Sequence, residues 1–304
     1  MPEMTKTKRP RLSRSDLSDK IFYLFIYVFL GFLALVILYP LYFIIIASIS
    51  DPDAVLGGDV ILFPVGITLS GFEAILHRSD VWFGYLNTII YTALTVVLSL
   101  VVTVPAGWAL SRKQLLGKKF FMIYFIIPMF FGGGLIPTYL LINNLGLLDS
   151  MWAVILPGAF SVWNMIIART YYQGVPRELR EASDVDGASE MTFFFKILVP
   201  ICMPLVAVLA LWQFVAMWNS YFDAMIYLND TAKQPLQLVL RSILIQSQPE
   251  SGMIADIQST AERAQLAELL KYATIIISSL PLIVMYPFFQ KYFDAGIMAG
   301  SIKG

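Results

Sequence analysis

Six long stretches of this 304-residue chain contain no Asp, Glu, Lys, Arg or His. Each holds close to or more than the ~20 residues that a helix needs to cross the hydrocarbon core of a bilayer. Lipid leaves only helices and closed barrels as spanning structures, and a barrel would show ~10-residue segments of alternating polarity, which we do not find. We therefore predict an all-α integral membrane protein with about six transmembrane helices. The stretches are Ile21–Ser50, Val81–Ser111, Phe120–Leu148, Ser150–Ala168, Ile197–Phe222 and Tyr272–Gln290.

The composition agrees with this prediction. Hydrophobic residues make up 58% of the chain and charged residues only 14%, whereas soluble domains average about 25% charged residues. The first stretch is also much longer than the apolar core of about 7–15 residues in a cleaved signal peptide. We therefore expect it to be retained as a transmembrane helix.

Lysine and arginine are distributed unevenly between the connecting segments, which indicates the orientation of the chain. If the N-terminus is cytoplasmic, 16 of the 21 basic residues fall on the cytoplasmic side and 5 on the outer side. We therefore predict a multi-pass protein with both termini in the cytoplasm. The predicted divisions are a basic cytoplasmic arm at 1–20, a six-helix membrane domain at 21–290 with outer segments at 51–80 and 223–270, and a cytoplasmic tail at 291–304. Membrane lipid with anionic headgroups attracts basic arms of this kind.

Two stretches predict local breaks in the helices. The sequence "FFGGGLIP" at 130–137 combines three glycines with a proline, which predicts either a break in that span or a close helix contact. The segment "RELREASDVDGASEMTFFFKILVP" at 177–200 is highly charged although it lies between two apolar stretches. It is too polar to continue either span, so we place it at the cytoplasmic face.

This charged segment has the signals of a helix–turn–helix. Pro176 suits the first turn of a helix, Gly187 suits a left-handed C-terminal cap, and Ser189 suits the N-cap of a second helix. We predict that the three phenylalanines Phe193–Phe195 anchor the second helix at the membrane interface or fill a groove in a partner protein.

The same segment resembles a known family. The triplet Glu-Ala-Ser at 181–183 and the following Gly187 are similar to the "EAA" loop of the membrane subunits of bacterial binding-protein-dependent ABC importers. The family pattern is Glu-Ala-Ala, a glycine four residues later, and Ile-x-Leu-Pro ten residues beyond that glycine. Ser183 replaces the second alanine and Val199 replaces the leucine, and both changes are mild.

The resemblance implies that the 176–195 region forms coupling helices that dock on a separate ATPase. Arg177 and Glu181 are four residues apart, so they lie on one helix face. The candidate coupling residues are Arg177, Glu178, Glu181, Ala182, Ser183, Asp186, Gly187, Ala188 and Phe193.

Nearly the whole chain resembles the smaller permease of maltose-type oligosaccharide importers. This likeness includes "GGGLIPTYLLINNLGLLDSMWAVILPG", "WNSYFDAM" and the closing "FDAGIMAGSIKG". It implies a maltose-transporter-like bundle in a bacterial inner membrane. It also implies four kinds of partner, namely an ABC ATPase dimer, a second related permease, an extracytoplasmic solute-binding protein and a carbohydrate substrate. By the same resemblance, residues near 243–265 contact the binding protein and the C-terminal tail reaches toward the ATPase.

The sequence lacks the groups that would make this chain an enzyme. The only Gly-Lys pair, at 117–118, has Arg112 where a phosphate-binding P-loop needs its first glycine. We therefore expect no cofactor on this chain, with ATP and Mg bound by the partner ATPase. One histidine and one cysteine provide neither a catalytic cluster nor a metal site, and we expect no nucleic-acid partner.

Polar and aromatic residues within the spans are candidates for a solute path, since sugars offer hydroxyls for hydrogen bonds and apolar faces for aromatic rings. The competing explanation is interhelical hydrogen bonding and an interfacial aromatic belt. The principal candidates are Asn87, Gln213, Trp218, Asn219 and Tyr221. The wider set adds Thr88, Tyr91, Asn164, Trp212 and Ser220. The group 213–221, near the outer end of the fifth span, is the strongest.

Three other functions remain open. The permease could carry another solute, such as a polyol, a glycerol phosphate or an acidic polysaccharide fragment; no Lys or Arg lies within a span to favour an anion, although a partner chain could supply one. A secondary carrier or channel would leave the EAA spacing unexplained and usually needs ionisable residues in the membrane. A membrane-embedded enzyme would need the catalytic cluster that this chain lacks.

Overall fold

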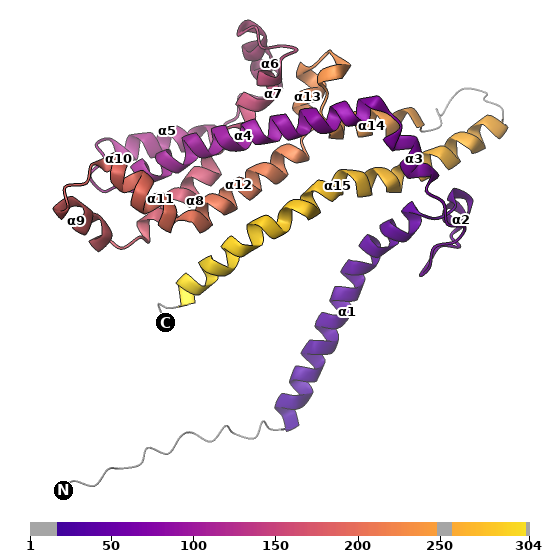
Figure 1. The fold of residues 1–304 in the computed structure, drawn as a ribbon, viewed down its shortest axis with the longest axis horizontal. Helices are drawn as coiled ribbons and strands as arrows, with labels where there is room; N and C mark the ends of the chain where they lie inside the picture. Colours follow the sequence, from indigo (N-terminus) through magenta and orange to yellow (C-terminus); the bar gives the residue numbers. More distant parts are fainter. Residues whose placement is uncertain (1–16, 248–256, 302–304) are drawn as a thin grey trace.

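The computed structural model describes the backbone of residues 17–247 and 257–301, and every regular element within these ranges is a helix (Figure 1). The elements are α1 (Leu17–Ser48), α2 (Pro52–Gly57), α3 (Ser70–Leu76), α4 (Ser79–Ser111), α5 (Lys118–Phe130), α6 (Leu135–Asn144), α7 (Met151–Gly158), α8 (Val162–Gln173), α9 (Glu178–Val185), α10 (Glu190–Thr192), the π-helical η1 (Phe193–Leu198), α11 (Val199–Ile201), α12 (Met203–Trp218), α13 (Phe222–Tyr227), the 3₁₀ turn η2 (Thr231–Lys233), α14 (Leu236–Ser247) and α15 (Ile257–Ser301). The prediction of an all-α protein is confirmed.

The six predicted spans correspond to three long helices and three bent helix pairs. Helices α1, α4 and α15 contain the continuous apolar segments Asp19–Ser48, Ser79–Ser111 and Ala267–Gln290. The other three spans consist of α5 with α6, α7 with α8, and α10–α11 with α12, bent by 112°, 41° and 76°. The count of six holds if each bent pair is one span.

Of the two alternatives at 130–137, the sharpest bend shows a break in the span. Gly134 has φ 86° and ψ 176°, a conformation that is essentially restricted to glycine. The bends between α7 and α8 and between α11 and α12 have other local causes. Ser161 caps α8 by accepting a hydrogen bond from the Asn164 amide (3.3 Å), and Cys202 leaves helical geometry just before Pro204.

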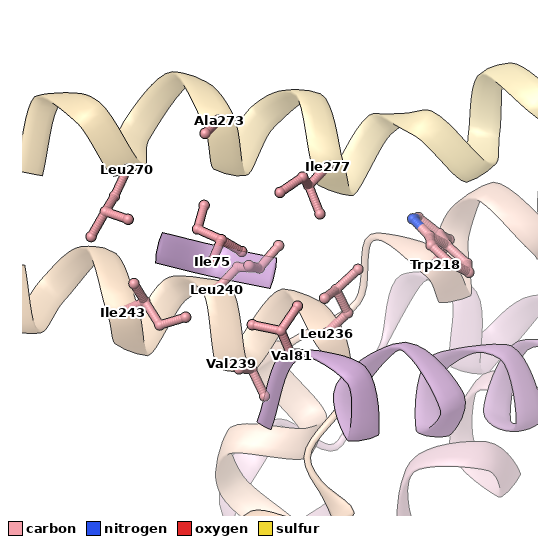
Figure 2. Packing of buried hydrophobic residues seen from close by; sticks show 10 residues of the cluster. All are labelled: Ile75, Val81, Trp218, Leu236, Val239, Leu240, Ile243, Leu270, Ala273 and Ile277. Carbon is pink, nitrogen blue, oxygen red and sulfur yellow. The ribbon is translucent and has the colours of Figure 1, made fainter. Parts of the chain in front are cut away.

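Helix α4 is the centre of the bundle and packs against α7, α8, α12 and α14. Its contact with α8 is close, because a Cβ atom on Gly107 would lie 2.6 Å from the Ala168 Cβ. At the end of the bundle that carries α3 and α14, side chains from α3, α4, α14 and α15 point toward one another beside Trp218 of α12 (Figure 2). A second buried cluster, from α4, α8, η1 and α12, lies toward the opposite end of the bundle, where Arg180 of α9 packs over its Phe193 ring.

Helix α1 diverges from the rest of the bundle (Figure 1), and none of its most apolar window is buried within this chain. It meets α15 near its C-terminal end, where the rings of Phe43 and Tyr272 are 5.8 Å apart. Helix α1 begins at Leu17, so residues 17–20 of the predicted arm are helical. Residues 1–16, 248–256 and 302–304 lie outside the described residues, and with them parts of the predicted arm, binding-protein contact region and tail.

Candidate coupling surface and solute-path cavity

The charged segment folds as the predicted helix–turn–helix, at one end of the bundle (Figure 1). Gly187 adopts φ +73° and the Ala188 amide donates to the Ser183 carbonyl (3.0 Å), which closes the end of α9. Ser189 caps the next helix by accepting from the Thr192 amide (3.2 Å). Pro176 differs from the expectation, because it precedes the N-cap residue Arg177 and lies outside the first turn.

The ion pairs of the loop are centred on a residue that sequence reasoning missed. Arg180 pairs with Asp184 (2.7 Å) and with Glu190 (3.1 Å), and Glu190 also pairs with Arg112 at the end of α4. These pairs connect α9, α10 and the turn after α4. Within the described part of the chain, the predicted neighbours Arg177 and Glu181 form no ion pair. The i, i+4 spacing of Arg180 and Asp184 was the available signal.

Most of the candidate coupling residues are exposed on one outward surface. Arg177, Glu178, Glu181, Ala182, Asp186 and Gly187 are exposed, and Ala188 is half-buried. Val185, on the same helix, is 88% exposed. Ser183 is the exception on α9, because it is buried and its hydroxyl has no hydrogen-bond partner.

Phe193 is predicted to belong to the coupling surface, but the structure buries it. Its side chain is 1% exposed and belongs to the second buried cluster. Its ring lies 5.6 Å from the Trp108 ring and 4.9 Å from the Arg180 guanidinium carbon. Phe194 is also buried, and only Phe195 of the three is exposed. Phe193 therefore connects α9 to α4 from inside, where no partner groove reaches it.

A cavity of about 490 Å³ lies between the α7–α8 pair and the end of α12. Five polar side chains and two tryptophans share its wall. Its lining residues are Val154, Gly158, Ser161, Trp163, Asn164, Trp212, Gln213, Ala216, Met217, Ser220 and Asp223. Gln213 is held by a hydrogen bond to the Gly158 carbonyl (2.9 Å) and contacts the Ser99 hydroxyl (3.4 Å). Aromatic faces beside fixed polar groups are the chemistry that binds sugars.

Of the five principal candidates for the solute path, only Gln213 lines this cavity. Trp218 is 1% exposed and donates to the Ser278 carbonyl (3.0 Å), so it joins α12 to α15. Asn87 donates to the Ala232 and Gln234 carbonyls and ties α4 to the segment before α14. Asn219 donates to the Val215 carbonyl.

Tyr221 also lies away from the cavity, because its ring packs under the Arg241 guanidinium at 5.1 Å. Asn87 and Trp218 thus make the bonds between segments that the competing explanation predicts, while Asn219 bonds within its own helix. Three cavity residues came from the wider set, namely Asn164, Trp212 and Ser220.

Sequence reasoning missed Ser161, Trp163 and Asp223 in the cavity wall. Asp223 follows the fifth span and is half-buried, and this burial raises the pKa of its carboxyl group. The "WNSYFDAM" stretch quoted above contains Asp223, so its place beside an outer span end was the available signal. The cavity wall carries one carboxyl group and no basic side chain.

The family model of the binding-protein-dependent transport system inner membrane component matches residues 81–299, which include both the coupling surface and the cavity. The chain belongs to this family. It is a permease component of a transport system in an inner membrane, and its multi-pass helical fold agrees with that assignment.

Relatives of known assignment match this permease along nearly its whole length. The polygalacturonan/rhamnogalacturonan transport system permease protein YtcP of Bacillus subtilis (strain 168) is 35% identical and aligns over 95% of this chain and 100% of its own. The maltodextrin permease MdxG of the same organism is 29% identical over 91% and 95% of the two chains. A chain in the crystal structure of a bacterial ABC transporter that imports the acidic polysaccharide alginate superimposes with a TM-score of 0.79, at 34% identity, covering 94% of this chain and 100% of that one.

Proposed function

We propose that this permease is one of the two membrane subunits of an ATP-driven importer for an oligosaccharide or a related carbohydrate. The observation that carries the proposal is the capped, exposed α9 loop at one end of a bundle that also carries an open cavity lined by polar and aromatic side chains. The relatives named for maltodextrin, polygalacturonan and alginate transport support a carbohydrate as the solute.

The coupling step is assigned to α9. Closure of a partner ATPase pair, which binds ATP and Mg, would push on the outward surface that carries Glu181 and Val185. The ion pairs of Arg180 and the buried ring of Phe193 connect that surface to α4, and α4 reaches both ends of the bundle (Figure 1). Rigid-body motion of packed helices then alternates the openings of the path.

The solute path is assigned to the cavity between α7–α8 and α12. Trp163 and Trp212 present aromatic surface, and Gln213 and Asn164 present amides. Asp223 supplies a carboxyl group that accepts hydrogen bonds from sugar hydroxyls and repels a negatively charged group. This wall therefore favours the uncharged face of a sugar, and an acidic solute would need a cation from the second permease.

We also propose three protein partners, which the family implies. They are an ATPase dimer, a related second permease and an extracytoplasmic solute-binding protein, with α9 and both termini in the cytoplasm. An ATP-independent carrier would give no reason for the exposed α9 loop, which Gly187 closes at its C-terminal end.

Co-purification tests this proposal. The full chain carries an affinity tag and is purified from gently solubilised membranes of the native host, and every retained protein is identified by mass spectrometry. We expect a P-loop ATPase, a second six-helix permease and a solute-binding protein. A chain that purifies alone and still moves sugar across vesicles without ATP would overturn the proposal.

A further inference from the structure

A second cavity, of about 630 Å³, lies beside the coupling loop and has more basic than acidic side chains in its wall. It is formed by the end of α4 and the turn after it, the end of α8, and α9. Five basic residues line it, namely Arg112, Lys113, Lys118, Arg177 and Arg180, together with the acidic residues Glu181 and Asp184. The volume is in the range of pockets that hold small ligands.

Part of this positive charge is not neutralised within the chain. Asp184 forms an ion pair with Arg180, and Glu190 forms ion pairs with both Arg180 and Arg112. Lys118 donates to the Ser111 and Arg112 carbonyls, which carry no formal charge. Among the described residues, Lys113 and Arg177 have no ion-pair partner. The cavity thus keeps an excess of cationic groups that face a shared space.

Two buried donors in the wall also lack acceptors. The Tyr172 side chain is 3% exposed, and its hydroxyl has no hydrogen-bond partner. One terminal nitrogen of Arg180, Nη1, is likewise buried without a partner. A buried donor without an acceptor costs about 1–3 kcal/mol, and a ligand oxygen that reached either donor would remove this penalty. Phosphate has the required charge and acceptors, and arginine binds it well.

We propose that this basic cavity binds a phosphate-bearing anion, either the headgroup of an anionic lipid or a soluble phosphate compound. Its place at the end of α4 and α8 puts it where a bilayer headgroup would lie, and basic pockets between membrane helices bind anionic headgroups. The proposal rests on the proposed function only for the orientation that makes this end cytoplasmic. Anion binding next to α9 would set the position of the loop that couples to the ATPase.

The test measures the melting temperature of the purified full chain in detergent. The additions are phosphatidylglycerol, phosphatidylcholine, and inorganic phosphate against chloride at equal ionic strength. A rise with phosphatidylglycerol alone identifies a lipid headgroup, and a rise with inorganic phosphate identifies a soluble anion. No rise with either anion overturns the proposal, whether or not the chain is an importer.

Three variants separate this cavity from general electrostatics. Lys113→Gln removes an exposed base from the wall, and Tyr172→Phe removes only the unpartnered hydroxyl. Lys119→Gln is the control, because Lys119 is exposed in the same region but does not line the cavity. We expect each wall variant to bind the anion about tenfold more weakly, while the control binds as wild type does. An equal effect of Lys113→Gln and Lys119→Gln would overturn the proposal.

Discussion

Asp149, in an unusual backbone conformation, joins the turn between α6 and α7 to the segment that we predict to be outer, 223–270. It has φ +56°, and its Oδ1 accepts from the Asn229 and Asp230 amides (3.1 and 3.0 Å). Lys233 Nζ donates to its Oδ2 (3.1 Å). The hydrogen bond from the Asp230 amide is the largest cause of a lowered pKa of Asp149, and the Lys233 ammonium and the Asn229 amide lower this pKa further.

A group with a lowered pKa stabilises the fold fully above its unfolded pKa, about 4 for a carboxyl group. That contribution is lost as the pH falls through the lowered, folded value. Asp149→Asn tolerates the left-handed conformation but loses the charge. We expect it to melt a few degrees below wild type at pH 7, by a difference that starts to shrink as the pH falls below ~4 and is lost below the folded pKa. A melting difference that does not change with pH would contradict this account.

We predict opposite effects on stability when Ser183 and Ser189 are each replaced by alanine. The Ser183 hydroxyl is buried without a partner, so Ser183→Ala should leave stability unchanged or raise it by up to about 1 kcal/mol. Ser189 caps α10, so Ser189→Ala should lower stability by about 1 kcal/mol. Thermal unfolding of the two variants in detergent checks the prediction. Equal losses of stability would show that the Ser183 hydroxyl has a partner.

At the scale of helices, the contact between α4 and α8 depends on Gly107. A methyl group there would lie 2.6 Å from the Ala168 Cβ and 3.1 Å from the Arg169 amide nitrogen. Because both atoms belong to or adjoin backbone, we expect Gly107→Ala to cost about 1–3 kcal/mol. Gly31→Ala in α1 is the matched control, since its added Cβ meets no atom within 4 Å. If Gly107→Ala melted at the same temperature as Gly31→Ala, this description of the packing would be wrong.

The α9 helix carries the prediction on coupling. Glu181→Lys reverses an exposed charge without touching the buried cluster, so we expect normal folding and about tenfold weaker association with the ATPase. Glu73→Lys, an equal charge change on an exposed residue of α3, serves as the control. Association is measured by the amount of ATPase that each tagged variant retains. Unchanged retention by Glu181→Lys would remove Glu181 from the coupling surface.

For the molecule as a whole, the sequence predicts the spans and the breaks better than it predicts the cavity. Charges are costly in lipid, so charge-free stretches reveal the spans, and the positive φ of Gly134 and Gly187 follows from glycine itself. Which polar side chains face a cavity depends on how bent helices pack, which the spacing of residues does not specify. Trp218 and Phe193 therefore fit a binding or docking pattern in sequence but lie in the interior.

The most direct test of the account is whether α9 touches the ATPase. Val185→Cys places a thiol on a residue that is 88% exposed, and the native Cys202 is buried. Ile67→Cys, on a residue that is 74% exposed near α3, is the control from the predicted outer side. A short thiol–amine cross-linker is added to membranes that contain the whole assembly. The account predicts a cross-link from position 185 to the ATPase and none from position 67; no cross-link at 185, or one at 67 instead, would contradict it.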